Sequence, residues 1–199
     1  MRLSRWYRDH WFLVGGLLFV VEAYVLAIWG GQMDMLLKFM IMSTMALHVH
    51  QFEKYAIPGG FPVFNNIAFM GEKELPDRVP LSKKGAFVCN VCCMYPVYLL
   101  ALIFHQYIWV GLCIMLFGVS QFLVHGVMIN RKAGTVYNPG LVSVIALFFS
   151  AMHCLYRLYL YKLHCPLVGL GTCRWLYSDR WFCLSAHVDE ENVRQKCAG

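Results

Sequence analysis

Charged residues are scarce in this sequence. Asp, Glu, Lys and Arg make up 14% of the 199 residues, against about 25% in an ordinary soluble domain. So little charge, together with 59% hydrophobic residues and a mean hydropathy of +0.54, argues against a soluble globular protein. Aromatic residues, at 16% of the chain, are too abundant for a disordered one. A multi-pass membrane protein is the class that remains.

The excess of basic residues is not arranged for nucleic acid. Seventeen Lys and Arg against 11 Asp and Glu give a formal net charge of +6, but these cations do not gather on one face of a soluble segment. We therefore expect no nucleic-acid partner and expect membrane lipids as the surroundings of the chain. The sequence leaves the oligomeric state open.

Five apolar stretches predict an all-α integral membrane bundle of about five transmembrane helices. A helix needs about 20 residues to cross about 30 Å of hydrocarbon. The stretches cover residues 11–30, 35–50, 86–104, 107–129 and 139–161. The second is the shortest and contains Lys38, whose ammonium can reach the nearer interface. For the fifth, we expect Asn138 as the N-cap and Pro139 at the first helical position.

The distribution of Lys and Arg predicts the orientation. The N-terminal head, residues 51–85 and the turn at 131–132 carry the cations, whereas the connections 31–34 and 105–106 have none. We therefore expect a cytoplasmic N-terminus. After the second stretch, IPGGFPVFNN is too rich in Pro and Gly for a helix and too apolar for a free linker. A re-entrant or interfacial loop fits both facts.

The cysteines fall into two groups. From His164 the composition changes, and we expect a poorly ordered tail of residues 164–199 beside a transmembrane domain of residues 1–163. The tail holds Cys165, Cys173, Cys183 and Cys197, which allow three pairings if it lies outside the cell. The run CNVCC at 89–93 lies within an apolar span, where thiols more often fill a core than bind metal.

Ionisable residues near membrane spans are costly to bury and are therefore functional candidates. His50 and Glu53 are three residues apart, so they are neighbours on one helical face, whereas His48 lies on another. An imidazole beside a carboxylate predicts either a general acid–base pair or two ligands of a single divalent metal. The plainer alternative is a hydrogen-bonded helix end.

A second polar group follows the fourth stretch. Counting the crossings places His125 on the same membrane face as His50, with Arg131 in the connection that follows. A helix beginning at Pro139 would also direct its free N–H groups there, which favours an anionic substrate group or a developing oxyanion. The plainer alternative is an ordinary N-cap before a helix. We predict as catalytic residues His50, Glu53, His125 and Asn130; as metal ligands His50, Glu53 and His125; and as a cofactor-binding residue Asn138.

Glu22 stands near the middle of the first stretch and should face the bundle interior. Two roles are open to it. It is either a proton relay or ligand, or a carboxyl group that is hydrogen-bonded to a neighbouring helix.

The two polar segments resemble the HXXEE domain family of small multi-pass membrane proteins. The motif runs here from His50 through Glu53 to Lys54, and the similarity continues at Pro58, Gly59 and Phe61 and in the blocks 125–130 and 137–140. It covers roughly residues 17–160. Lys54 replaces the second acid, so a dinuclear metal site is not expected, whereas the His50 and Glu53 pair is kept. The resemblance implies an uncharacterised protein whose polar motif suggests enzymatic activity.

Two functions are therefore open. The first is an intramembrane enzyme whose His/Glu site at the cytoplasmic interface acts on a lipid-like substrate. The second is a non-catalytic transporter component or membrane assembly factor, in which the same residues form a structural polar network. A separation of His50, Glu53 and His125 onto different faces would remove the main support for an enzyme.

Overall fold

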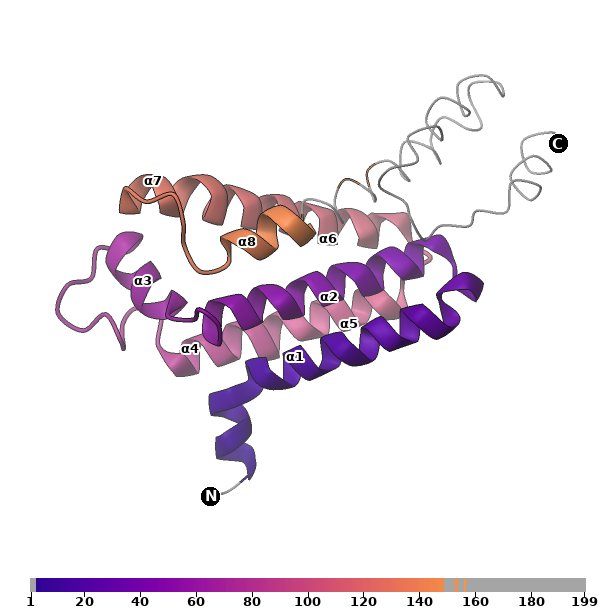
Figure 1. Ribbon diagram of the computed structural model, residues 1–199, viewed down its shortest axis with the longest axis horizontal. Helices are drawn as coiled ribbons and strands as arrows, with labels where there is room; N and C mark the ends of the chain where they lie inside the picture. Colours follow the sequence, from indigo (N-terminus) through magenta and orange to yellow (C-terminus); the bar gives the residue numbers. More distant parts are fainter. Residues whose placement is uncertain (1–2, 149–152, 154–155, 157–199) are drawn as a thin grey trace.

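The computed structural model describes residues 3–148 together with His153 and Tyr156, and the elements in this part are helices. The first two are α1 (Leu3–Trp29) and α2 (Met35–Tyr55), joined by a 3₁₀ turn, Gly30–Gln32. Asp34 caps α2 by accepting hydrogen bonds from two backbone N–H groups of its first turn. The backbone leaves helical geometry at His10, and the first turns of α1 point away from the bundle (Figure 1).

The rest of the described chain forms one short helix and three longer helical runs. The short helix is α3 (Phe61–Ala68). The first run joins α4 (Lys83–Phe87), the π-helical segment η2 (Val88–Met94) and α5 (Tyr95–Ile103). The second joins α6 (Ile108–Gln121), the π-helical segment η3 (Phe122–Ile129) and α7 (Asn130–Ala133). The third begins with α8 (Leu141–Ser143) and continues as the π-helical segment η4 (Val144–Phe148).

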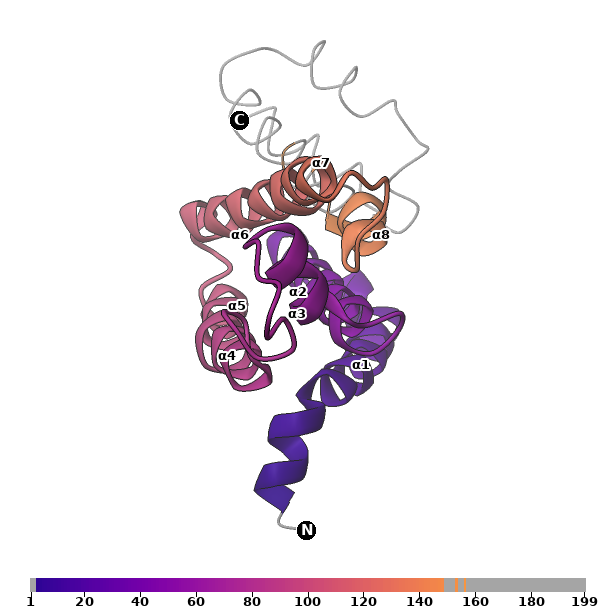
Figure 2. The ribbon, with the colours of Figure 1, turned by 90° about the vertical axis from the view of Figure 1, so that its left-hand side faces the viewer.

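Helix α2 occupies the centre of the bundle. It runs between α1 and α5 on one side and α6 and α8 on the other (Figures 1 and 2). Its first half supplies the apolar core, which includes Met40 and Leu47 and is closed by Tyr98, Ile114 and Val144 from the surrounding helices. Its second half carries polar side chains into the same interior, so α2 is the element that positions the site.

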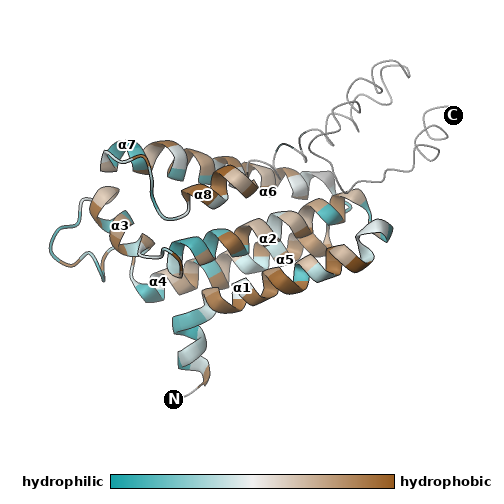
Figure 3. Ribbon diagram, in the orientation of Figure 1, coloured by the Kyte–Doolittle hydropathy of each residue, from teal (hydrophilic) through white to brown (hydrophobic). Residues whose placement is uncertain are grey.

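Within the described residues, three helices are long and apolar enough to cross a membrane: Leu3–Gln32, Lys83–Ile103 and Trp109–Ala133. Hydrophobic residues dominate all three, and hydrophilic residues gather at one end, in α7, in the loop after α3 and in the last turns of α2 (Figure 3). Helix α2 has the length of a span but is not among the three, because its sequence contains more polar residues than theirs. The fifth predicted stretch is described continuously only as far as Phe148, and the tail 164–199 lies outside the described residues.

Two local predictions were wrong. The segment after α2 contains the helix α3, because the positive φ of Gly60 (+78°) makes the turn and Pro62 then falls in the first helical turn, where its missing N–H costs nothing. The third run begins at Leu141 instead of Pro139. Its N-cap is Gly140 with φ +108°, and no side chain caps it from that position. Asn138 is used elsewhere.

Candidate functional site

Glu53 ties α2 to the N-terminus of α8. Its carboxylate accepts four hydrogen bonds: from the backbone N–H groups of Val142 (3.1 Å) and Ser143 (2.8 Å), the Ser143 hydroxyl (2.6 Å) and the Tyr137 hydroxyl (3.3 Å). All four groups donate, so the site is built for an acceptor. The helix N–H groups that were expected to meet an anionic substrate are therefore occupied by the protein's own carboxylate.

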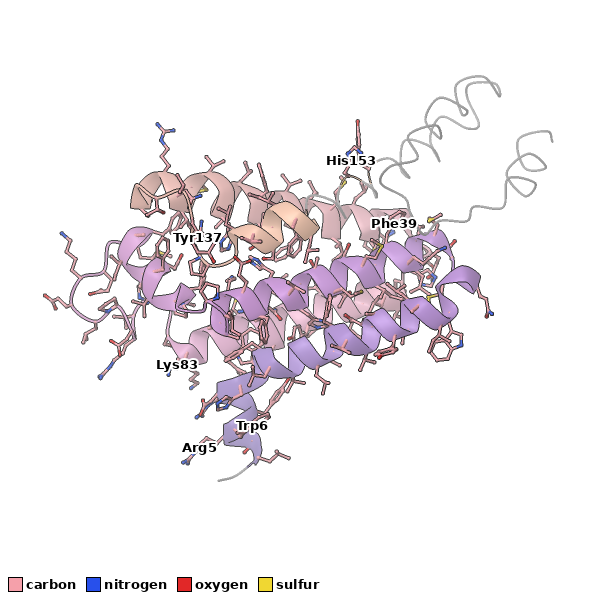
Figure 4. All side chains as sticks on the ribbon, in the orientation of Figure 1. Arg5, Trp6, Phe39, Lys83, Tyr137 and His153 are labelled. Atoms are coloured by element: carbon pink, nitrogen blue, oxygen red, sulfur yellow. The ribbon has the colours of Figure 1, made fainter. Side chains whose placement is uncertain are left out.

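Tyr137 approaches this carboxylate from the loop before α8, at the end of the bundle where Lys83 begins α4 (Figure 4). Desolvation and then the nearby Glu53 carboxylate raise the pKa of the Tyr137 hydroxyl. Both effects keep its proton in place, so Tyr137 remains a donor to Glu53.

His50 lies one helical turn before Glu53, and its ring is fixed by the same loop. Its Nδ1 lies 2.9 Å from the Ser143 hydroxyl oxygen and 3.2 Å from the Gly140 carbonyl oxygen. The shortest contact of the Ser143 hydroxyl is to the Glu53 carboxylate, so its lone pairs face His50. Both neighbours of Nδ1 are then acceptors, and Nδ1 carries the proton. A neutral His50 ring consequently has its lone pair on Nε2.

His125, in the π-helical segment η3, has the same tautomer for a different reason. The Asn138 amide nitrogen donates to the His125 carbonyl (2.7 Å) and to the Asn130 side-chain oxygen (2.7 Å). This fixes the orientation of the amide, so its oxygen, 2.6 Å from His125 Nδ1, must be the acceptor. His125 therefore also donates from Nδ1 and keeps its Nε2 lone pair.

The two imidazoles form a close pair around one glycine. Their ring centroids are 4.8 Å apart and their planes are nearly perpendicular, at 89°. A Cβ atom at Gly140 would lie 2.8 Å from Cε1 of both rings, and Gly140 has a φ of +108°. Only glycine fits between the rings. The π-helical backbone around His125 belongs to a class of distortion that is frequent at functional sites.

One atom of this pair has no partner. His50 is 2% exposed, and its Nε2 makes no hydrogen bond with any group of the described chain. The side-chain amide of Gln121 approaches the ring without completing a hydrogen bond of ordinary geometry to Nε2. A buried nitrogen with a free lone pair is rare in a native structure. A polar network with a purely structural role would not need this unpaired nitrogen.

The structure places the predicted site residues as follows. His50 and His125 come together, and Glu53 joins them indirectly through Ser143. Asn130 holds Asn138 by a hydrogen bond, so both act through His125. Arg131 is exposed. No group of three or more His, Cys, Asp or Glu residues within the described ranges is arranged to hold a metal ion, so the metal stays a prediction.

A second polar network lies on another face of α2. Glu22 of α1 is 3.0 Å from Nδ1 of His48, which gives Glu22 the neighbouring-helix partner that the sequence did not reveal. Gln51, fully buried, accepts from the Tyr95 hydroxyl (2.8 Å) and donates to Asn90 (3.3 Å). Cys89, Cys92 and Cys93 are exposed rather than core residues. This network joins α1 and α2 to the Lys83–Ile103 run.

Sequence reasoning did not identify Ser143, Gly140 and Gln51. Ser143 and Gly140 lie about 90 residues from the motif that they serve, and no local pattern marks Ser143. The position of Gly140 directly after Asn138 and Pro139 is the one available signal, because an N-P-G sequence indicates a turn with a positive φ.

Comparison with known proteins agrees with the motif. A family model described as a protein of unknown function with HXXEE motif matches residues 41–155, which is more than half of the chain. The matched region includes both histidines, Glu53 and the loop that holds them. No curated protein and no solved structure gives a significant match.

Proposed function

Because this chain belongs to the HXXEE family, whose function is unknown, we propose its function from the site itself: it is an intramembrane enzyme that performs acid–base chemistry on a lipid-like substrate. The observation that carries the proposal is the free, buried Nε2 of His50. The Nδ1–H group donates to the Ser143 hydroxyl oxygen, and the Ser143 hydroxyl donates to the Glu53 carboxylate. This relay fixes the tautomer that a general base requires.

In this mechanism, His50 takes a proton from a substrate hydroxyl or a water at Nε2. The positive charge that forms on the ring is stabilised through the Nδ1–H, the Ser143 hydroxyl and the Glu53 carboxylate. His125, with its own Nε2 lone pair, is a second proton carrier within reach of the same substrate. Asn138 and Asn130 position His125.

A lipid-like substrate fits the location of the site. The histidine pair is flanked by Lys54 and α3 at the polar end of the bundle, and His125 itself belongs to the candidate span Trp109–Ala133. An amphiphile from the surrounding bilayer can keep its chains in the hydrocarbon while its polar group reaches this end. We propose acid–base chemistry over a metal site because all four hydrogen-bond donors around Glu53 already use its oxygens.

Untargeted lipid analysis tests this proposal. Cells that express the full chain should show a lipid species that rises or falls relative to cells expressing His50→Ala at an equal, folded level. Glu53→Gln should share the defect. Identical lipid profiles for the native chain and His50→Ala would contradict the proposed enzymatic activity. Metal analysis of the same purified samples decides between acid–base chemistry and a metal that depends on His50 and His125.

The alternative is a non-catalytic transporter component or assembly factor. The second network, with the fully buried Gln51 bonded to both Tyr95 and Asn90, favours it, because these polar groups have partners within the chain and need no ligand. On this reading, His50→Ala changes thermal stability only, and any folded variant supports whatever phenotype deletion of the chain produces.

We also propose that α2 and the helix beginning at α8 cross the bilayer, giving five spans with a cytoplasmic N-terminus. Helix α2 has 21 residues, which corresponds to about 30 Å at 1.5 Å per residue, and it packs along α1. Its polar residues are covered by neighbouring helices instead of lipid. Single cysteines at positions 31 and 73, in a chain whose own reactive thiols are removed, should be labelled from opposite sides of sealed vesicles. Labelling from the same side would contradict this topology.

A further inference from the structure

Lys54 occupies the position where the family motif has its second acid, and its side chain is almost wholly buried. It is 9% exposed. Its ammonium lies 4.1 Å from the centroid of the Phe61 ring and 5.6 Å from that of the Tyr55 ring. Lys54 therefore places a positive charge where the second acid of the motif would place a negative charge.

Within residues 3–148, the charge of Lys54 has no carboxylate partner. Lys54 makes no ion pair and no hydrogen bond in this part of the chain, and its ammonium lies over two aromatic rings. Glu53 is adjacent in sequence, but its oxygens are engaged by the loop before α8 and by α8 itself. A cation over an aromatic ring is attracted only moderately, whereas burying an unpaired charge is costly. An anion that binds there would remove the imbalance.

Lys54 is also next to the reacting histidines. The Phe61 ring beneath its ammonium lies 5.1 Å from the His125 ring, and the charge of Lys54 acts on both His125 and His50. A group bound at Lys54 would therefore stand at the edge of the histidine pair. His50 Nε2, Lys54 and the Phe61 ring combine a proton acceptor, an anion-binding group and an apolar wall.

The position of Lys54 in the bundle indicates which anion it would bind. Lys54 lies in the last turn of α2 and Lys132 in the last turn of α7, which both belong to the polar end of the bundle (Figure 3). Lys132 donates to the Phe69 carbonyl there. If the helices cross as proposed, this is the depth of lipid headgroups, whose common anionic group is a phosphate. Lys54 matches it as a point charge.

We propose that Lys54 binds the phosphate group of the substrate on which the histidine pair acts. This assignment rests on the proposed function and deepens it, because it names the substrate as a phosphate-bearing amphiphile. Lys54 is then a specificity residue, whereas His50 performs the proton transfer.

The test measures retention of phosphatidylglycerol by the full chain in phosphatidylcholine nanodiscs, using native mass spectrometry. Lys54→Met removes the charge and keeps a long apolar side chain over Phe61. Lys132→Met is the matched control, because Lys132 also lies over a phenylalanine ring, that of Phe69, at 4.3 Å. We expect at least a tenfold loss of retention for Lys54→Met and none for Lys132→Met. Equal retention by Lys54→Met and the native chain would overturn the proposal.

Competition with inorganic phosphate identifies the source of the anion. If millimolar inorganic phosphate displaces phosphatidylglycerol in a Lys54-dependent way, the site takes soluble phosphate esters as well. If it does not, the acyl chains are part of the ligand. A lack of any phosphatidylglycerol preference over phosphatidylcholine contradicts the proposal in either case.

A crosslinking experiment and a second variant complete the test. If Lys54→Met does not fold, a photoreactive phosphatidylglycerol on the native chain should crosslink to peptides containing Tyr55 or Phe61, and crosslinks confined to other helices would refute the site. His50→Gln should retain phosphatidylglycerol while losing the change in the lipid profile. Lys54→Met thus tests the phosphate site, and His50→Gln tests the enzymatic activity.

Discussion

The replacement of Glu53 by glutamine tests how the motif holds the bundle together. The substitution exchanges one carboxylate oxygen for an amide NH₂ of similar size. Each oxygen of Glu53 accepts from a backbone N–H that cannot turn away, Val142 at one and Ser143 at the other. In either orientation of the glutamine amide, the new NH₂ therefore faces a backbone N–H, and one buried donor loses its acceptor.

The magnitude follows from these contacts. An unsatisfied buried donor costs about 1–3 kcal/mol, and loss of a negative charge at a helix N-terminus costs about 0.3–2 kcal/mol. We expect Glu53→Gln to lower the free energy of unfolding by about 2–4 kcal/mol, since part of the two costs overlaps. For a chain of this length, about 2–4 °C per kcal/mol places the fall in Tm at about 5–15 °C.

Thermal unfolding of the purified chain in detergent measures this effect, and Glu72→Gln provides a matched control. The Glu72 carboxylate also accepts two backbone N–H bonds, from Glu74 and Leu75, but in an exposed loop where water can replace them. Its substitution should change the Tm by less than about 2 °C. An unchanged Tm for Glu53→Gln, or equal shifts for the two variants, would refute the buried capping role of Glu53.

Two further predictions follow from the same packing. Gly140→Ala should destabilise the chain by more than about 2 kcal/mol, because its Cβ would meet both imidazoles; Gly134→Ala, with open space around it, should cost less by thermal unfolding. Gln51→Leu should lower stability by about 2–3 kcal/mol, because it leaves the buried Asn90 side-chain oxygen and the part-buried Tyr95 hydroxyl without their partner; an unchanged Tm would show that this network is dispensable.

Helical periodicity and the order of crossings predicted the parts of the site that depend on them. His50 and Glu53 share a face because they are three residues apart in a helix that continues to Tyr55. His48 was correctly placed on another face, and its partner is Glu22. His125 meets His50, as expected from helices whose ends lie at the same side of the bundle. These features follow from repeat lengths that a sequence displays directly.

The rest depends on contacts between distant residues. Whether the helix N–H groups would receive a ligand or a side chain of the protein was open from the sequence, and Glu53 from α2 takes them. Asn138 is a good N-cap by residue type, yet its side chain bonds His125 and Asn130 instead. Tertiary packing decided both of these cases. The prediction for the segment after α2 was wrong for a local reason: its Pro and Gly content disfavours a helix, but Gly60 takes a positive φ at the N-cap and Pro62 falls in the first helical turn.

The tautomer of His50 is the most direct test of the central claim that the motif prepares its Nε2 for proton transfer. Nitrogen NMR of the full chain with labelled histidines, assigned by loss of a signal in His50→Gln, measures it. We predict a neutral ring with its proton on Nδ1 and an unprotonated Nε2, and a weaker preference in Ser143→Ala, where the Gly140 carbonyl is the acceptor that remains at Nδ1. A His50 ring that carries its proton on Nε2 would contradict the role of His50 as a general base.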